Sequence, residues 1–188
     1  MRLTLPIQRR AAILLLVLAA FDFAILAAQE AGLRINTTAS MPLGLYRLRP
    51  QGNDELSRGS FIAICPSAKV LAVAIPRHYL HRGLCPGDVE PLLKSVGALP
   101  GDRVNVSDDA VLVNGHALPN SGRVARDCQG RPLLRIPAGA YVVPARNLWL
   151  YAPVARSWDS RYFGPEPDSN VIGIATPILL VGEGRTCA

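Results

Sequence analysis

Charged residues are scarce in this sequence, at 18% of 188 positions, where a soluble domain usually has about a quarter. Lysine is rarer still, because Lys69 and Lys94 are the only two, so arginine supplies most of the net charge of +6. The arginines are scattered, and only Arg9 and Arg10 are adjacent. No basic helix or aromatic-basic alternation is present, so no nucleic-acid interface is predicted, and the charge better fits a solvated surface that faces an anionic membrane.

The sequence has no C-x-x-C spacing, so zinc sites and thioredoxin-like redox motifs are not indicated. An even number of cysteines is typical of disulfides in an oxidising compartment. Cys65 and Cys85 flank a proline-containing segment and are the pair that we expect, while buried free thiols are the alternative. His78 and His81 have no acidic or cysteine partner at a suitable spacing, so we predict no metal and no other cofactor. The four cysteines are Cys65, Cys85, Cys128 and Cys187.

A G-x-S-x-G nucleophile elbow and internal repeats are also absent, whereas proline and glycine are abundant, with 16 of each. Apolar segments alternate with turn signals roughly every 8–12 residues, which predicts a mainly β domain of short strands. Asn114-Gly115 predicts a hairpin turn. A helix is expected at residues 68–74, ended by Pro76, and a loop or short helix at 77–87. The expected strands are residues 45–48, 60–65, 92–96, 104–106, 111–113, 135–143, 147–150 and 171–181.

One long apolar run, residues 11–28, follows Arg9 and Arg10 and contains Asp22 as its only charge. With the apolar residues before it, the run reaches about the 20 residues that span a bilayer core. Positive charge before the run and none directly after it place residues 1–10 in the cytoplasm and residues 29–188 outside. A cleavable signal peptide has a similar pattern, but its apolar part is usually only about 7–15 residues long. We therefore predict an uncleaved, single-pass transmembrane anchor.

Lys94 is unusual because Leu92, Leu93 and Val96 surround it, and lysine is almost never fully buried unless it is paired. Desolvation would lower the pKa of this amine, so that it could accept a proton from a serine hydroxyl near neutral pH. For this residue taken alone, the alternative is a strand lysine whose ammonium reaches water.

Three segments in order along the chain carry a resemblance to a known family. They are residues 37–42 (TTASMP), 94–102 (KSVGALPGD) and 157–164 (SWDSRYFG). These segments resemble the conserved boxes of the type I signal peptidases, the S26 serine peptidases with a Ser-Lys dyad. The resemblance extends from the apolar run to the last expected strand. It implies a signal-peptidase-like β domain of short antiparallel strands with a small helical insert, preceded by one transmembrane helix.

The resemblance also implies catalytic roles. Ser40 would attack the scissile carbonyl, and Lys94 would accept its proton. The backbone N–H of Ser40 and the hydroxyl of Thr38 would form the oxyanion hole.

Supporting roles fall on the third box. Asp159 and Arg161 would hold the site together as an ion pair, and Ser157 and Ser160 would hydrogen-bond near the lysine. A purely structural role for Asp159 is the alternative.

Some features depart from the general enzymes of the family. Residues 151–156 (YAPVAR) replace their Gly-Asp-Asn-Arg-like run, and the chain has no room for the large second β-domain of some members. The run SMPLGLY at 40–46, the helical insert at 68–80 and Cys85-Pro86-Gly87 look more like the TraF branch. That branch contains maturation peptidases of conjugative transfer systems, which process a pilin precursor and in some cases join its ends.

The function predicted is a membrane-anchored serine endopeptidase of a bacterial cytoplasmic membrane, with its catalytic domain in the periplasm. Its expected partners are a protein precursor such as a pilin, the lipid bilayer and components of a transfer or secretion machine. The alternatives are a general signal peptidase I and a noncatalytic pilus or secretion assembly factor. A cytoplasmic self-cleaving repressor would use the same dyad but would need no membrane span.

Overall fold

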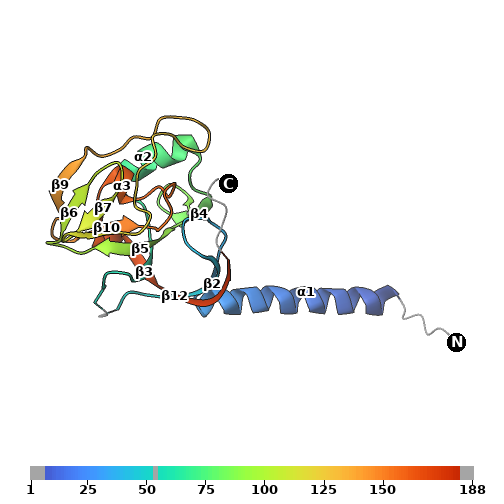
Figure 1. Ribbon diagram of the computed structural model, residues 1–188. Coiled ribbons are helices and arrows are strands. Elements are labelled where there is room, and N and C mark those ends of the chain that lie inside the picture. The colour runs from blue at the N-terminus through green and yellow to red at the C-terminus, as the bar shows by residue number, and fades with distance from the viewer. Residues whose placement is uncertain (1–6, 53–54, 183–188) are drawn as a thin grey trace.

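The structure is a computed structural model that describes residues 7–52 and 55–182. Residues 1–6 of the expected cytoplasmic segment and Cys187 lie outside the described residues. One long N-terminal helix projects from a domain of two antiparallel sheets (Figure 1). The predicted class, a mainly β domain with a small helical insert after an apolar N-terminal helix, is confirmed.

Helix α1 (Ile7–Glu30) extends away from the domain, and its apolar side chains are exposed, with Phe23 at 73%. A helix of 24 residues is about 36 Å long, which exceeds the roughly 30 Å of a bilayer core. By length and composition α1 could therefore cross a membrane, and a signal sequence near the N-terminus would satisfy the same criteria.

The larger sheet has seven strands in the order β1-β2-β12-β3-β5-β10-β11. They are β1 (Leu33–Asn36), β2 (Leu43–Arg49), β3 (Phe61–Ile64), β5 (Leu92–Ala98), β10 (Asn147–Tyr151), β11 (Glu166–Pro167) and β12 (Val171–Gly182). β1 and β2 form a hairpin in which Asn36 pairs with Gly44, so residues 37–42 form its turn. A Cβ at Gly44 would collide with the backbone of Leu179, so glycine lets β12 pass close to this hairpin. β5 lies between β3 and β10, which places Lys94 inside the sheet.

The smaller sheet has the order β8-β7-β6-β9. Its strands are β6 (Arg103–Val106), β7 (Val111–Val113), β8 (His116–Ala117) and β9 (Gly139–Val142). Asn114 and Gly115 form the predicted hairpin turn, with the positive φ angles of 50° and 87° that such a turn requires. The turn between β5 and β6 is held by the Asp102 carboxylate, which accepts hydrogen bonds from Arg58, the Leu99 backbone and Asn114. The strand that carries Lys94 therefore ends at a fixed turn.

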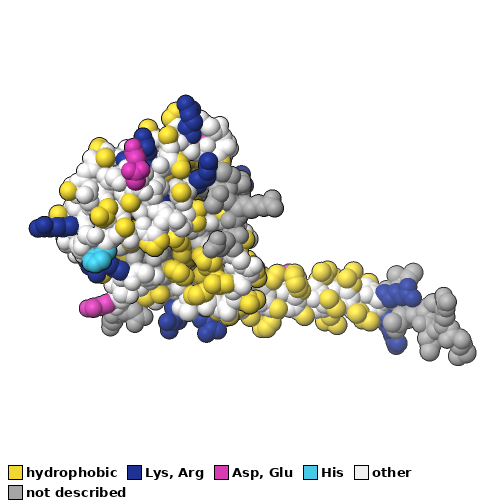
Figure 2. Space-filling view, viewed as in Figure 1, with side chains coloured by type: hydrophobic (Ala, Val, Ile, Leu, Met, Phe, Trp, Pro, Cys, Tyr) yellow, Lys and Arg dark blue, Asp and Glu magenta, His cyan; other side chains and the backbone are white. Residues whose placement is uncertain are grey.

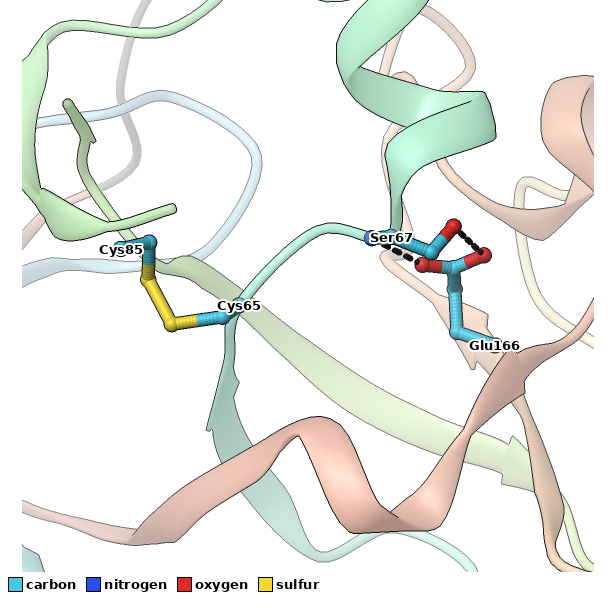
Figure 3. Close-up of a disulfide and its surroundings, with 4 residues drawn as sticks. All are labelled: Cys65, Ser67, Cys85 and Glu166. Atoms are coloured by element: carbon cyan, nitrogen blue, oxygen red, sulfur yellow. Dashed lines mark hydrogen bonds between the residues drawn. A yellow bond between two sulfur atoms is a disulfide. The ribbon is translucent and has the colours of Figure 1, made fainter. Parts of the chain in front are cut away.

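Helix α2 (Ala68–Arg77) is the helical insert, and its start is held by Glu166 of β11 (Figure 3). The Glu166 carboxylate accepts hydrogen bonds from the Ser67 backbone N–H at 2.8 Å and the Ser67 hydroxyl at 2.9 Å. A carboxylate is favourable there because it satisfies a free N–H and complements the helix dipole. The disulfide Cys65–Cys85, the pair favoured from the sequence, joins the end of β3 to β4 (Arg82–Cys85) (Figure 3).

Several boundaries differ from the predicted ones. Pro76 lies inside α2, which continues one residue further to Arg77, and the left-handed φ of 54° at His78 ends it. β1 and β4 were not predicted: each has only four residues, and β4 (RGLC) also lacks alternating polarity. The strand expected at 135–143 forms only at Gly139–Val142, since Pro137 precedes it.

The one-turn helix α3 (Ser160–Phe163), which Asp159 caps, is too short to show a helical periodicity in the sequence. The 3-10 turn η1 (Asp168–Asn170) follows it.

Two clusters of buried apolar side chains form the core of the domain. One joins the smaller sheet to β10 around Trp149, which is fully buried, and the other joins β3, β5 and β10 around Ile62 and Leu150. β5 and β10 contribute to both clusters, so the backbone that positions Lys94 is packed on both faces.

Candidate active site

Ser40 lies in the turn of the β1–β2 hairpin, and the buried side chain of Asn36 holds this turn. The Asn36 amide nitrogen donates to the carbonyl oxygens of Thr38 at 3.1 Å and of Met41 and Pro42 at 3.0 Å each. Its Oδ1 accepts from the Thr38 backbone N–H at 3.1 Å and from the Thr38 hydroxyl at 2.7 Å. Carbonyl oxygens on one side and donors on the other determine which way the amide points. Asn36 therefore fixes the backbone on both sides of Ser40.

Two further groups anchor the same turn. Met41, directly after Ser40, is only 2% exposed. The hydroxyl of Tyr46 on β2 donates a hydrogen bond to the Pro42 carbonyl at 2.7 Å. The serine is thus carried on a turn whose following residues are packed and hydrogen-bonded.

Lys94 lies on β5 and is 3% exposed. Its Nζ donates a hydrogen bond to Ser157 Oγ at 3.1 Å. Ser157 belongs to the loop that leaves β10, the strand paired with β5, and this loop returns the hydroxyl to the lysine. Within the described part of the chain this is the one hydrogen bond of the ammonium, so burial is only weakly compensated.

Burial lowers the pKa of Lys94 from 10.5 to about 8, because desolvation disfavours the charged form. The Asp159 carboxylate raises this pKa and the Arg161 guanidinium lowers it, so the two neighbours largely oppose each other. An amine with a pKa near 8 is neutral in about a tenth of molecules at pH 7 and can then accept a proton.

Asp159 and Arg161 form a buried ion pair that acts on the pKa of Lys94, and both side chains have no exposed surface. The guanidinium contacts both carboxylate oxygens, with Nε–Oδ1 at 2.8 Å and Nη2–Oδ2 at 2.7 Å. Arg161 also donates to backbone carbonyls, among them those of Gly122, Val154 and Ser157. A pair so completely hydrogen-bonded can remain charged inside the protein, and it holds the loop that carries Ser157.

Ser40 and Lys94 line one cleft with a volume of about 310 Å³. The other walls come from the segment after α2, the loop at 124–133 and the loop at 154–158. In the part of the structure that is described, no hydrogen bond joins Ser40 to Lys94, whose nitrogen instead bonds to Ser157. The fold thus brings the two residues to the walls of one cleft.

Two of the other expected site residues form hydrogen bonds within the fold. The Thr38 hydroxyl donates to Asn36 and not toward open space in the cleft. Ser160, expected near the lysine, accepts a hydrogen bond from the Leu150 backbone N–H at 2.8 Å. Ser160 therefore ties α3 to β10.

Sequence reasoning missed Asn36, Tyr79 and Asp127 as residues that shape the site. Asn36 had a local signal, because an Asn before Thr-Thr is a common start of a side-chain-stabilised turn. Tyr79 and Asp127 had none, since the hydrogen bond between them joins residues 48 positions apart. His78 and His81 also line the cleft, and among the described residues no group of three or more metal-ligating side chains is assembled.

Comparison with known proteins shows the family of the chain. A family model described as signal peptidase, peptidase S26, matches residues 7–180. The chain is 44% identical to a conjugal transfer protein TraF of Agrobacterium tumefaciens (strain 15955), over 92% of this chain and 97% of that protein. It is 38% identical to a plasmid transfer protein TraF of Escherichia coli, over 81% of this chain and 86% of that protein.

Among solved structures, a signal peptidase I from Enterococcus faecalis V583 matches with a TM-score of 0.38 and 21% identity, over 65% of this chain and 98% of that one. This likeness is too low to add weight. The family match and the TraF relatives each cover most of the sequence, and on that ground the chain belongs to the signal peptidase family, peptidase S26.

Proposed function

We propose that this chain is a membrane-anchored serine endopeptidase in which Ser40 is the nucleophile and Lys94 the general base. The observation that carries the proposal is a buried lysine, with its pKa lowered to about 8, in the same cleft as a serine on a fixed turn. A neutral amine is what a serine hydroxyl needs as a proton acceptor, and Ser-Lys pairs are a known variant of this chemistry.

The chemistry would run in two stages. Ser40 Oγ attacks the scissile carbonyl carbon while its proton moves to Lys94 Nζ, and the tetrahedral intermediate then expels the amine, which takes that proton. A water molecule or a substrate amine next attacks the acyl-enzyme and releases Ser40. The Ser40 backbone N–H and the Thr38 hydroxyl would stabilise the oxyanion, which requires the hydroxyl to turn away from Asn36.

Membrane anchoring through α1 is the second part of the proposal. Exposed apolar side chains continue from α1 onto the strands beside it, with Ile35 of β1 at 76% and Val181 of β12 at 72%. Figure 2 shows hydrophobic side chains gathered on the domain where it meets α1. Such a surface fits a domain that rests against the outer face of the bilayer, where a membrane-bound precursor would present its cleavage site.

The proposed biological role is maturation of a pilin precursor in conjugative transfer by cleavage, with release of either a linear or a cyclic product. It is supported by the relatives, which are named as conjugal and plasmid transfer proteins. We propose a periplasmic catalytic domain at residues 29–188, which the positive charge of Arg9 and Arg10 before the apolar run 11–28 favours.

The test is to co-produce the chain with the pilin precursor of its transfer system and to follow the precursor by mass spectrometry. Ser40→Ala and Lys94→Ala should each abolish processing in a folded protein. Ser57→Ala and Lys69→Ala, which change exposed residues outside the cleft, should leave it intact. A product one water molecule lighter than the trimmed linear peptide would indicate cyclisation.

Normal processing by either catalytic variant would refute the dyad. Processing of many signal peptides but not of the pilin precursor would instead favour a general signal peptidase. Transfer that proceeds normally with Ser40→Ala but fails without the chain would favour a noncatalytic assembly factor.

A further inference from the structure

The charged side chains that line the cleft are unbalanced. Four arginines line it together with a single acidic residue, Asp127. Glu90 lies nearby, within 3.5 Å of the His81 backbone N–H, but it does not line the cleft. The arginines are Arg77, Arg126, Arg131 and Arg156. An excess of one sign of charge inside a cleft attracts ligand groups of the opposite sign.

The Asp127 carboxylate already has hydrogen-bond donors on both of its oxygens. Its Oδ2 accepts hydrogen bonds from the Tyr79 hydroxyl and from Arg131 Nε, both at 2.7 Å, and its Oδ1 accepts two backbone N–H groups. Burial alone would raise the pKa of this carboxyl, but the hydrogen bonds from Tyr79 and Arg131 hold it below its usual range. Asp127 and Arg131 therefore neutralise each other.

The remaining three arginines have no carboxylate partner in the described part of the chain. Arg77 is held in place, because its Nη1 donates to the Pro132 carbonyl at 2.7 Å and to the Tyr79 hydroxyl at 3.2 Å. Arg126 donates to the Gly130 carbonyl at 2.7 Å, and Arg156 is exposed. All three guanidinium groups keep N–H donors for a ligand.

Aromatic side chains connect the part of the cleft that the arginines line to the part that contains Lys94. The Tyr79 ring lies under Arg131, with the guanidinium carbon 5.4 Å from the ring centre, and packs edge-on against Trp158 at 5.2 Å. Trp158 directly follows Ser157, the hydrogen-bond partner of Lys94. A substrate segment bound near Lys94 would therefore reach the arginines along one continuous surface.

We propose that Arg77, Arg126 and Arg156 form a subsite for a carboxylate of the substrate, which is either an acidic side chain or a free C-terminus. The proposal rests on the peptidase function proposed above, because it assumes that a peptide occupies the cleft. It deepens that function by giving the substrate a chemical property, a negative charge close to the scissile bond. Guanidinium groups suit this task since they bind carboxylates with two parallel hydrogen bonds.

The experiment measures binding rather than cleavage. Full-length Ser40→Ala protein in a neutral detergent is titrated by calorimetry with alanine-based nine-residue peptides that carry one Glu at each position in turn. The matched set carries Gln instead, and each peptide is made with a free C-terminal acid and with an amide. The first comparison detects a side-chain carboxylate and the second detects a terminal one.

We expect at least one Glu peptide, or the free-acid form, to bind about fivefold more tightly than its neutral match at low salt. The preference should fall below about twofold near 0.5 M salt, because screening shortens the range of the attraction. Arg126→Gln combined with Arg156→Gln should remove it. Arg103→Gln, which changes an exposed arginine of β6 outside the cleft, should preserve it.

Equal affinities for all Glu and Gln peptides and for acid and amide forms, or no binding of any of them, would overturn the subsite. So would a preference that survives the double variant or is lost equally in Arg103→Gln. A preference for carboxylates together with intact processing in Ser40→Ala would overturn the proposed dyad while leaving the subsite in place, so the two failures are distinguishable.

Discussion

The hydroxyl of Thr38 donates a 2.7 Å hydrogen bond to Oδ1 of Asn36, and the same oxygen also accepts the Thr38 backbone N–H. In the site without substrate, the hydroxyl proposed to stabilise the oxyanion is therefore bonded to Asn36. When the Thr38 hydroxyl turns toward a developing oxyanion, Oδ1 of Asn36 still accepts the hydrogen bond from the Thr38 backbone N–H. This oxygen therefore keeps one of its two partners. The side-chain contact that shapes the Ser40 turn is thus also the one that the reaction would break.

Thr38→Val tests this rearrangement. We expect kcat to fall by about 10²–10³, because one oxyanion donor is lost in the transition state, with little change in KM. The thermal unfolding midpoint should change little, since Asn36 keeps its four other hydrogen bonds. Steady-state kinetics on a fluorogenic peptide would decide, and an unchanged kcat would mean that this hydroxyl stays on Asn36 throughout.

Asn36→Ala should have a different signature. It leaves the Met41 and Pro42 carbonyls and the Thr38 N–H without their partner, so we expect a loss of about 2–4 kcal/mol in unfolding free energy together with a lower kcat. Asn147→Ala, which removes one exposed hydrogen bond to Ala145, should cost within about 0.5 kcal/mol. Equal losses in the two variants, measured by urea unfolding, would show that Asn36 has no special role.

The pH dependence of kcat/KM follows from the Lys94 pKa. Burial lowers this pKa to about 8, and only the neutral amine accepts a proton, so activity should rise with pH and level off above about 8. If the base were an ordinary solvated lysine, the same rise in kcat/KM would be centred near pH 10.4. A rate profile of the wild-type chain between pH 6 and about 10 would distinguish the two cases.

Lys94→Met should abolish activity and yet stabilise the protein at neutral pH. The buried amine has a lowered pKa, so between about pH 8 and 10.5 the unfolded chain binds one proton more than the folded chain, and wild-type stability rises through this window. Below it, keeping the ammonium buried costs about 3 kcal/mol, which methionine would recover. The unfolding free energies of the variant and of the wild-type protein should be compared at pH 7 and at high pH. The stability gained by Lys94→Met should shrink as pH rises. A gain that does not change with pH would contradict a lowered Lys94 pKa.

Asp159→Asn should destabilise the domain by about 3–5 kcal/mol, because it leaves the fully buried Arg161 guanidinium without a counter-charge. After burial, the Asp159 carboxylate has the largest influence on the Lys94 pKa, and it raises this pKa. Its removal should therefore lower the Lys94 pKa and move the rise of kcat/KM with pH to lower pH. Asp168→Asn breaks an ion pair with Arg146, which is 78% exposed, and should cost less than about 1 kcal/mol. Similar losses in both variants would argue against a special role for the buried pair.

Local signals in the sequence were strong enough for part of the fold. Alternating apolar residues predicted β6 and β7, and Asn114-Gly115 predicted their neighbouring hairpin turn, because both patterns act within a few residues. The same reasoning failed for β1 and β4, which have only four residues each: β1 pairs with β2 across the Ser40 turn, and β4 is bridged to Val89.

For the site, the sequence by itself determined the family resemblance, the apolar anchor candidate and the residue types around Ser40 and Lys94, since these lie in contiguous segments. Only the tertiary structure decided which groups surround them. The partner of Lys94 comes from 63 positions away, the Asp127 partner of Tyr79 comes from 48 positions away, and the Ser160 hydroxyl accepts a hydrogen bond from the Leu150 backbone N–H. The apolar neighbours of Lys94 in the sequence were enough to predict the direction of its pKa shift. Its hydrogen-bond partner and the positive charge of its cleft had no local pattern, because they depend on segments that folding brings together.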